Sequence, residues 1–172
     1  HRALANARDR EEMEAFWGVP AGRIAPQPGL SSIELFQAMA QGRVKSVWVI
    51  ATNPMVSMPN LSLAREAMRL AELVVVNDIY HPTETTQWAD VVLPSAQWSE
   101  RDGTMTNSER CVSYLEQAVA PPGEALPDWR ILCRFAQAMG FGQAFAFQSA
   151  EDVYEEYKRS TRGRDLDIGG IT

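Results

Sequence analysis

Three short, mostly apolar runs divide the middle of the chain and predict its fold. They read SVWVIA (46–51), LVVV (73–76) and DVVL (90–93). Each run is too short for a typical helix and is rich in β-branched residues, as expected of strands buried on both faces of a sheet. Residues 61–70 have helical periodicity, and residues 83–88 can form a short helix. This order predicts a parallel βαβαβ sheet with right-handed crossovers.

Further patterns precede this sheet. Residues 7–17 predict an N-terminal helix, and residues 20–29 predict a loop because they hold three prolines and two glycines. Ser31 and Glu34 form a capping-box pattern, which begins the next helix.

The pattern changes after the third run. Residues 104–114 alternate irregularly and predict extended segments outside the parallel sheet, whereas residues 127–139 and 149–158 predict amphipathic helices. The inward residues expected for the first of these helices are Trp129, Leu132, Phe135 and Ala136. The predicted fold class is therefore α/β: a Rossmann-like, three-layer parallel sheet with a partly extended and helical C-terminal extension.

Composition narrows the possible functions. The 172 residues are 45% hydrophobic and 22% charged, which is enough material for one well-buried core. A net charge of −6 argues against a nucleic-acid groove or an anionic membrane surface as a partner. No apolar run approaches the roughly 18 residues of a membrane span. Two cysteines and two histidines match no metal-site spacing, so we expect no metal ligands here.

Candidate binding residues follow the predicted strands, because ligands of open parallel sheets bind at the carboxyl ends of the strands. Thr52 and Asn53 follow the first strand in a loop without a GxGxxG pattern, and this loop presents side chains rather than bare amides. Asn77 and Asp78 follow the second strand, where the carboxylate could accept two hydrogen bonds from a ribose diol or from guanine. The alternatives are a simple turn at Asn53 and a helix N-cap at Asp78.

A polar run follows the third strand. Its cationic and polar side chains suited to phosphate are Arg101, Thr104, Thr106, Asn107 and Arg110. Each arginine could instead form an exposed ion pair of little value. Asp128 could simply favour the start of its helix as a cap or first-turn acid. We find no pair of nucleophile and general base, so the sequence predicts a binding surface and no catalytic centre.

Ordered motifs across residues 29–139 add a family resemblance. They are TNPMVSMPN, VVVNDIYHPTETTQWADVVLPSAQWSERDGTMTNSERCV and PPGEALPDWRIL. This set resembles the catalytic subunit of molybdopterin oxidoreductases, which bind a bis-molybdopterin guanine dinucleotide cofactor. Within that family it is most similar to the assimilatory nitrate reductases, because formate dehydrogenases tend to have Gly-Glu-Asn-Pro where this chain has Ala51–Pro54.

The resemblance implies that one guanine dinucleotide lies across the carboxyl ends of the sheet. By motif position, the expected contacts are Thr52, Asn53, Asn77, Asp78, Arg101 and Asp128. Arg101 stands where the family often has Lys, and both side chains can meet a phosphate. Cys111 stands where the family often has a second Arg after Glu109-Arg110, which weakens a charge-based role for this segment.

The resemblance also implies an internal piece of a longer subunit. The expected parts are residues 1–30 as a helix and Pro/Gly-rich loop, 31–100 as the parallel α/β cofactor-binding domain, and 101–172 as a polar cofactor-facing segment with helices of a neighbouring subdomain. The family's [4Fe-4S] motif, molybdenum-ligand segment and closing C-terminal domain lie outside this chain.

The implied parent is a cytoplasmic nitrate reductase, with the rest of the catalytic subunit as partner and a ferredoxin, flavodoxin or NADH-linked reductase as electron donor. Two alternatives stay open. One is a formate dehydrogenase catalytic subunit with the same cofactor, and the other is a non-catalytic, molybdopterin-like structural subunit of NADH dehydrogenase.

Overall fold

The computed structural model describes residues 2–171, which form two compact units. The central unit spans Leu30–Ala146, and the terminal unit combines the stretches before and after it. The expected division of the chain into residues 1–30, 31–100 and 101–172 stays a prediction. No helix within the described range is long and apolar enough to cross a membrane.

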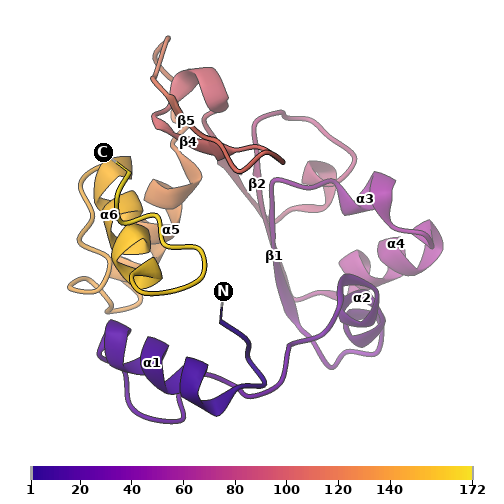
Figure 1. Cartoon of the computed structure of the whole chain (residues 1–172). Coiled ribbons are helices and arrows are strands. Elements are labelled where there is room, and N and C mark those ends of the chain that lie inside the picture. The colour runs from indigo at the N-terminus through magenta and orange to yellow at the C-terminus, as the bar shows by residue number, and fades with distance from the viewer. Residues whose placement is uncertain (1, 172) are drawn as a thin grey trace. The chain divides into compact units, whose positions relative to one another are not determined.

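A three-stranded parallel sheet organises the central unit. It consists of β1 (Ser46–Ile50), β2 (Leu73–Asp78) and β3 (Val91–Pro94), in the order β1-β2-β3 (Figure 1). The predicted βαβαβ arrangement is therefore confirmed. Because the strands are parallel, all three end on the same edge of the sheet.

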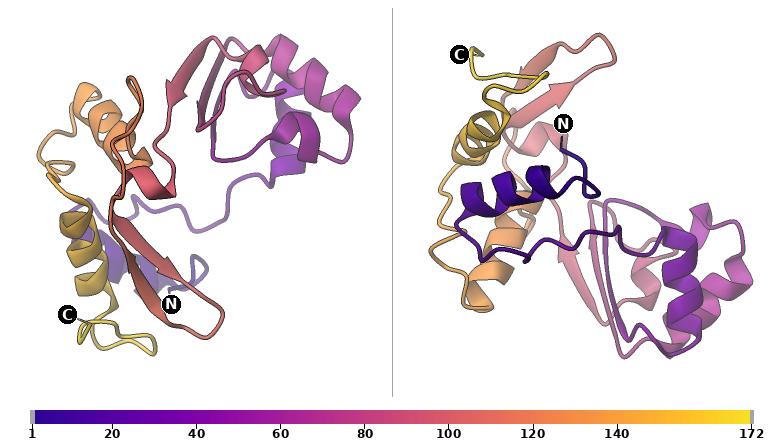
Figure 2. Two further views of the ribbon diagram at one scale, coloured as in Figure 1. Left: turned by 90° about the horizontal axis from the view of Figure 1, so that it is seen from above. Right: turned by 60° about the horizontal axis from the view of Figure 1, so that its bottom comes forward.

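Three helices cover one face of this sheet. They are α2 (Ser32–Ala40), α3 (Pro54–Ser57) and α4 (Leu61–Leu70), and Figure 2 shows them together on one side. The predicted capping box of Ser31 and Glu34 begins α2. The buried core under these helices consists of Phe36, Met39, Val49, Met55, Met58, Ala64, Ala67, Met68, Val74 and Val76. Alternate residues of β1 and β2 point into it, as strand geometry requires.

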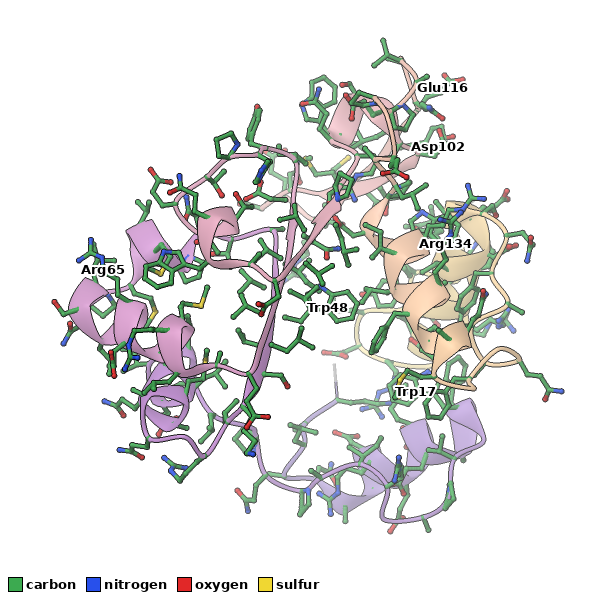
Figure 3. All side chains as sticks on the ribbon, turned by 180° about the vertical axis from the view of Figure 1, so that it is seen from behind. Trp17, Trp48, Arg65, Asp102, Glu116 and Arg134 are labelled. Carbon is green, nitrogen blue, oxygen red and sulfur yellow. The ribbon has the colours of Figure 1, made fainter. Side chains whose placement is uncertain are left out.

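The opposite face of the sheet meets α5 (Asp128–Ala138), which completes the three layers. Trp48 of β1, which is labelled in Figure 3, contacts Phe135 of α5 edge to face, with ring centroids 4.9 Å apart. The coverage is partial, because a cavity of about 430 Å³ lies between strand and helix side chains, including Trp48, Val75, Leu93, Ile131 and Phe135.

The predicted inward face of α5 is partly wrong. Its buried residues are Ile131, Cys133 and Ala136, whereas Leu132 is 38% exposed and Phe135 is 51% exposed. Helical spacing places Leu132 and Phe135 on one apolar stripe, but this whole stripe is buried only where a broad surface lies under the helix. The sheet is only three strands wide, and Phe135 reaches it only at the edge of Trp48.

The segment after β3 leaves the parallel sheet, as predicted. It contains the short 3-10 helix η2 (Trp98–Glu100) and an antiparallel hairpin of β4 (Gly103–Thr106) and β5 (Val112–Leu115). Figure 2 shows the hairpin as an arm apart from the sheet. The helix predicted over 83–88 is shorter than expected, a 3-10 turn called η1 (Thr86–Trp88).

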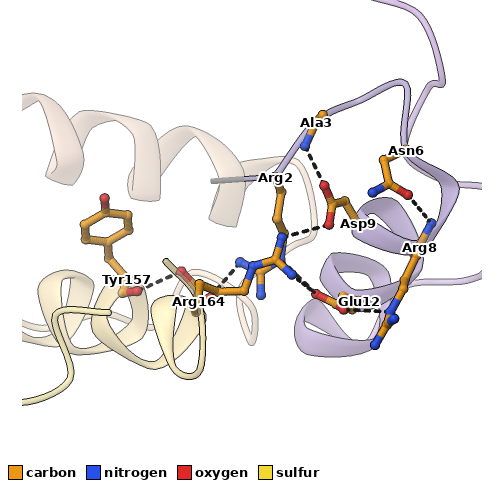
Figure 4. Close-up of polar contacts among 9 residues, drawn as sticks. Arg2, Ala3, Asn6, Arg8, Asp9, Glu12, Tyr157 and Arg164 are labelled. Atoms are coloured by element: carbon orange, nitrogen blue, oxygen red, sulfur yellow. Dashed lines mark hydrogen bonds and ion pairs between the residues drawn. The ribbon is translucent and has the colours of Figure 1, made fainter. Parts of the chain in front are cut away.

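The terminal unit pairs α1 (Ala7–Trp17) with α6 (Ala150–Thr161), and both predicted helices are confirmed. A cluster of ion pairs links α1 to the segment after α6 (Figure 4). The guanidinium of Arg164 contacts Asp9 at 2.8 Å and Glu12 at 3.1 Å. The Ala3 amide hydrogen bond, together with Arg164, lowers the pKa of Asp9 below its ordinary value.

Candidate functional site

Polar residues follow all three strands of the central sheet at their common carboxyl edge. Thr52 and Asn53 follow β1, Asp78 ends β2, and Ser95 follows β3. Ligands of open α/β sheets bind at this edge, where loops rather than strands supply the contacts. The predicted location of the binding residues therefore coincides with a polar edge in the structure.

The backbone after β1 is strained. Ala51 has a φ of +55°, a left-handed conformation that costs a residue with a Cβ about 1–2 kcal/mol. Its amide donates to the Asn77 carbonyl of β2. The chain therefore turns sharply at the end of β1, and this turn delivers Thr52 and Asn53 to the polar edge.

The Asn53 side chain ties the loop after β1 to the loop after β2. Its Oδ1 accepts a hydrogen bond from the Thr85 hydroxyl at 2.6 Å, and its Nδ2 donates to Glu84 at 2.8 Å. This bond to Asn53 lowers the pKa of Glu84 below its ordinary value. An Asn side chain can form about four hydrogen bonds, so one N–H and one lone pair of Asn53 remain for a ligand.

Asn77 and Asp78 point to opposite faces of the sheet, because successive strand residues alternate. Asn77 is fully buried on the α5 side, where its Oδ1 accepts from Trp48 Nε1 at 2.7 Å. Its Nδ2 is buried without a hydrogen-bond partner among residues 2–171. The two side chains therefore cannot contact one ligand from the same direction.

Asp78 keeps much of its capacity to accept hydrogen bonds. Its Oδ1 accepts from the backbone amide of Tyr80 at 3.1 Å, which closes a local turn after β2. Asp78 is therefore not a helix N-cap, because the helix that follows it, η1, has Thr85 in the N-cap position. Oδ2 has no hydrogen-bond partner within the described residues, so it remains available at the strand end.

Arg101 and Asp128, which are 27 residues apart, meet beside the end of β3. Asp128 Oδ2 accepts from Arg101 at 3.2 Å, and Asp128 Oδ1 accepts from the buried hydroxyl of Ser95 at 2.7 Å. Asp128 is the first residue of α5, yet its side chain forms no helix cap. Its carboxylate instead holds Arg101, which retains further N–H donors for a ligand.

The other polar residues of the hairpin have a simpler role. Asn107 Oδ1 accepts from the amides of Glu109 and Cys111, which closes the turn between β4 and β5. Arg110 lies in that turn with a φ of +63°. Asn107 and Arg110 therefore belong to a hairpin turn.

Sequence reasoning missed two hydroxyl groups that organise the edge, those of Thr85 and Ser95. Both are buried and bond to residues more than 30 positions away. No spacing rule links such pairs. Ser95 directly follows the apolar run that forms β3, which was an available signal because a buried polar group needs a partner, whereas Thr85 lies in a polar stretch that gave none.

Comparison with known proteins identifies the family. A family model described as molybdopterin oxidoreductase matches residues 5–138. The chain belongs to this family. The matched range includes all six predicted site residues.

The chain is similar to several curated oxidoreductases. It is 41% identical to a nitrate reductase of Synechocystis sp. and 36% identical to the assimilatory nitrate reductase catalytic subunit of Bacillus subtilis, each over 172 residues. Each of these alignments covers the whole chain but 24% of the relative. An F420-dependent formate dehydrogenase 1 subunit alpha of Methanococcus maripaludis is 43% identical over 138 residues, which are 80% of the chain and 20% of the relative.

A solved structure supports the same fold. Acetylene hydratase from Pelobacter acetylenicus superposes with a TM-score of 0.67 at 28% sequence identity, over 86% of this chain and 21% of that one. The chain thus spans about a quarter of the length of the curated nitrate reductases.

Proposed function

We propose that this chain is the cofactor-binding portion of a molybdenum nitrate reductase catalytic subunit. In this proposal it holds one guanine dinucleotide of the Mo-bis-molybdopterin guanine dinucleotide cofactor. The chemistry that the bound cofactor supplies is oxygen-atom transfer from nitrate, which leaves nitrite. The observation that carries the proposal is the carboxyl edge of the sheet, where all three strands are followed by polar side chains.

The side chains at this edge suit a guanine dinucleotide. Asp78 offers carboxylate oxygens to the donor edge of guanine or to a ribose diol, and paired contacts of this charged kind are strong. Arg101 offers planar N–H donors to a phosphate, oriented by Asp128. Thr52 is exposed beside Asn53. Its hydroxyl can therefore contact the ligand together with the unused N–H of Asn53.

Asn77 has a narrower role in the proposed site. Its side chain lies on the face of the sheet away from Asp78 and bonds to Trp48. Its backbone carbonyl accepts the amide of Ala51, which holds the strained turn after β1. We therefore propose that Asn77 stabilises the turn beside the site and that Asp78 contacts the dinucleotide directly.

Nitrate is the proposed substrate, and formate is the second candidate. The similarity to two nitrate reductases covers the entire chain at 41% and 36% identity, whereas the similarity to two formate dehydrogenase subunits covers 80% and 92% of it at 43% and 38% identity. The proposed partners are the rest of the catalytic subunit, with its [4Fe-4S] cluster, and an electron donor such as ferredoxin, flavodoxin or an NADH-linked reductase. The proposed location is the cytoplasm, which cell fractionation tests.

Purification of the full-length subunit tests this function. We expect molybdenum and a guanine nucleotide in the purified protein, and methyl viologen-linked reduction of nitrate. Formate oxidation without nitrate reduction would select the second candidate. A protein that lacks both molybdenum and guanine nucleotide would contradict both enzyme assignments and favour a structural subunit.

A further inference from the structure

Thr85 is a buried polar residue with a fully defined hydrogen-bond pattern. Its side chain is inaccessible to solvent, and its hydroxyl accepts the backbone amide of Met55 at 3.2 Å. The hydroxyl proton is then free to bond to Oδ1 of Asn53, at 2.6 Å. One hydroxyl of the loop between β2 and β3 thus bonds both to the start of α3 and to the Asn53 side chain that precedes it.

The neighbouring Glu84 accepts a hydrogen bond from the nitrogen of the Asn53 side-chain amide. A carboxylate only accepts hydrogen bonds, so the Asn53 atom at 2.8 Å from Glu84 must be the amide nitrogen. Thr85 and Glu84 together therefore allow one orientation of Asn53. Its remaining N–H and lone pair point in directions that the protein sets before any ligand binds.

We propose that Thr85 is a positioning residue for the guanine dinucleotide and acts through Asn53. This inference rests on the proposed function of the polar edge. Thr85 lies in the loop between β2 and β3 but orients a side chain that follows β1, so it ties these two loops together. A ligand that meets a preoriented amide loses less freedom on binding.

Cofactor retention in the full-length enzyme tests the proposal. The measured quantity is the rate at which molybdenum and acid-released GMP leave the purified protein at a fixed temperature. We expect Thr85→Val, which keeps the shape and removes the hydroxyl, to raise this rate about fivefold to tenfold, since a buried bond is lost. Thr85→Ser should return it to within about twofold of wild type.

A double variant separates positioning from general stabilisation. If Thr85 acts through Asn53, Thr85→Val should speed the loss of cofactor far less in the Asn53→Ala background than in wild type, because only the Met55 amide then loses its acceptor. The matched control is Thr161→Val in the terminal unit, where the hydroxyl bonds to the Lys158 carbonyl, and it should retain cofactor as wild type does. If Thr85→Val does not fold, Thr85→Ala removes the same hydroxyl and is measured in the same way.

The outcomes distinguish this inference from the function on which it rests. Wild-type protein with cofactor, and Thr85→Val with the wild-type loss rate, would overturn the inference alone. Additive effects of Thr85→Val and Asn53→Ala would also overturn it, because they would show a separate structural role. Wild-type protein without guanine nucleotide would overturn both.

Discussion

Asp128 links three parts of the central unit, so its removal has an effect that can be worked out from the structure. In Asp128→Ala, the Ser95 hydroxyl loses a charged acceptor while only 7% of Ser95 is exposed. A hydrogen bond to a charged group contributes roughly 1.5–3 kcal/mol. The partner Arg101 is 36% exposed, so that ion pair adds at most about 1 kcal/mol.

Two smaller effects nearly cancel. Loss of a negative charge from the first turn of α5 costs roughly 0.3–1 kcal/mol, whereas alanine improves helix propensity by roughly 0.5 kcal/mol. We therefore expect Asp128→Ala to lower the free energy of unfolding by about 2–3 kcal/mol. Asp128→Asn keeps an acceptor for Ser95 and should cost only about 1 kcal/mol.

Urea unfolding of the chain, followed by tryptophan fluorescence, measures these differences. Four of the five tryptophans lie in the central unit, so this signal reports mainly on it. Glu72→Ala is the control, because it breaks a direct but exposed ion pair with Lys45 and should lower the free energy of unfolding far less than Asp128→Ala does. The reasoning is refuted if Asp128→Ala is as mild as Glu72→Ala, or if Asp128→Asn is as damaging as Asp128→Ala.

Two further predictions concern backbone strain and acid. Ala51→Gly should raise the free energy of unfolding by up to about 1 kcal/mol, since relief of the positive φ exceeds the added flexibility of the unfolded chain, and a loss of stability in urea would contradict this. Hydrogen bonds from the Ile24 and Gly22 amides lower the pKa of Glu14 below its ordinary 4.5, so its contribution is complete above that pH and is lost as the pH falls through the lower folded-state value. Thermal unfolding by circular dichroism should show a smaller loss between pH 5 and pH 3 in Glu14→Gln than in wild type, and equal losses would remove Glu14 from this role.

The parallel sheet could be predicted from the sequence because its signal is local. Runs such as SVWVIA and LVVV are short, apolar and β-branched, and they predicted strands correctly. The expectation that both faces are buried was only partly right, because β1 and β3 are mostly half-buried or exposed. Helix starts were equally clear, since a capping box such as Ser31 with Glu34 lies within four residues. The polar edge followed from these elements, because parallel strands end together.

The side-chain hydrogen bonds at that edge could not be predicted in the same way. Asn53 with Thr85, and Ser95 with Asp128, are separated by more than 30 residues, and only the folded chain brings them together. One part was within reach of the sequence: adjacent strand residues point to opposite faces, so Asn77 and Asp78 could have been assigned different roles. The inward face of α5 failed because its partner surface is narrow.

If the polar edge holds a guanine dinucleotide, Asp78 should be needed to retain it. The measurement is the molybdenum and GMP content of the full-length subunit, in wild type and in Asp78→Ala, with circular dichroism as the check on folding. We expect stoichiometric cofactor in wild type and a severalfold lower content in folded Asp78→Ala. Wild-type cofactor content in that variant would show that the edge does not hold the dinucleotide through Asp78.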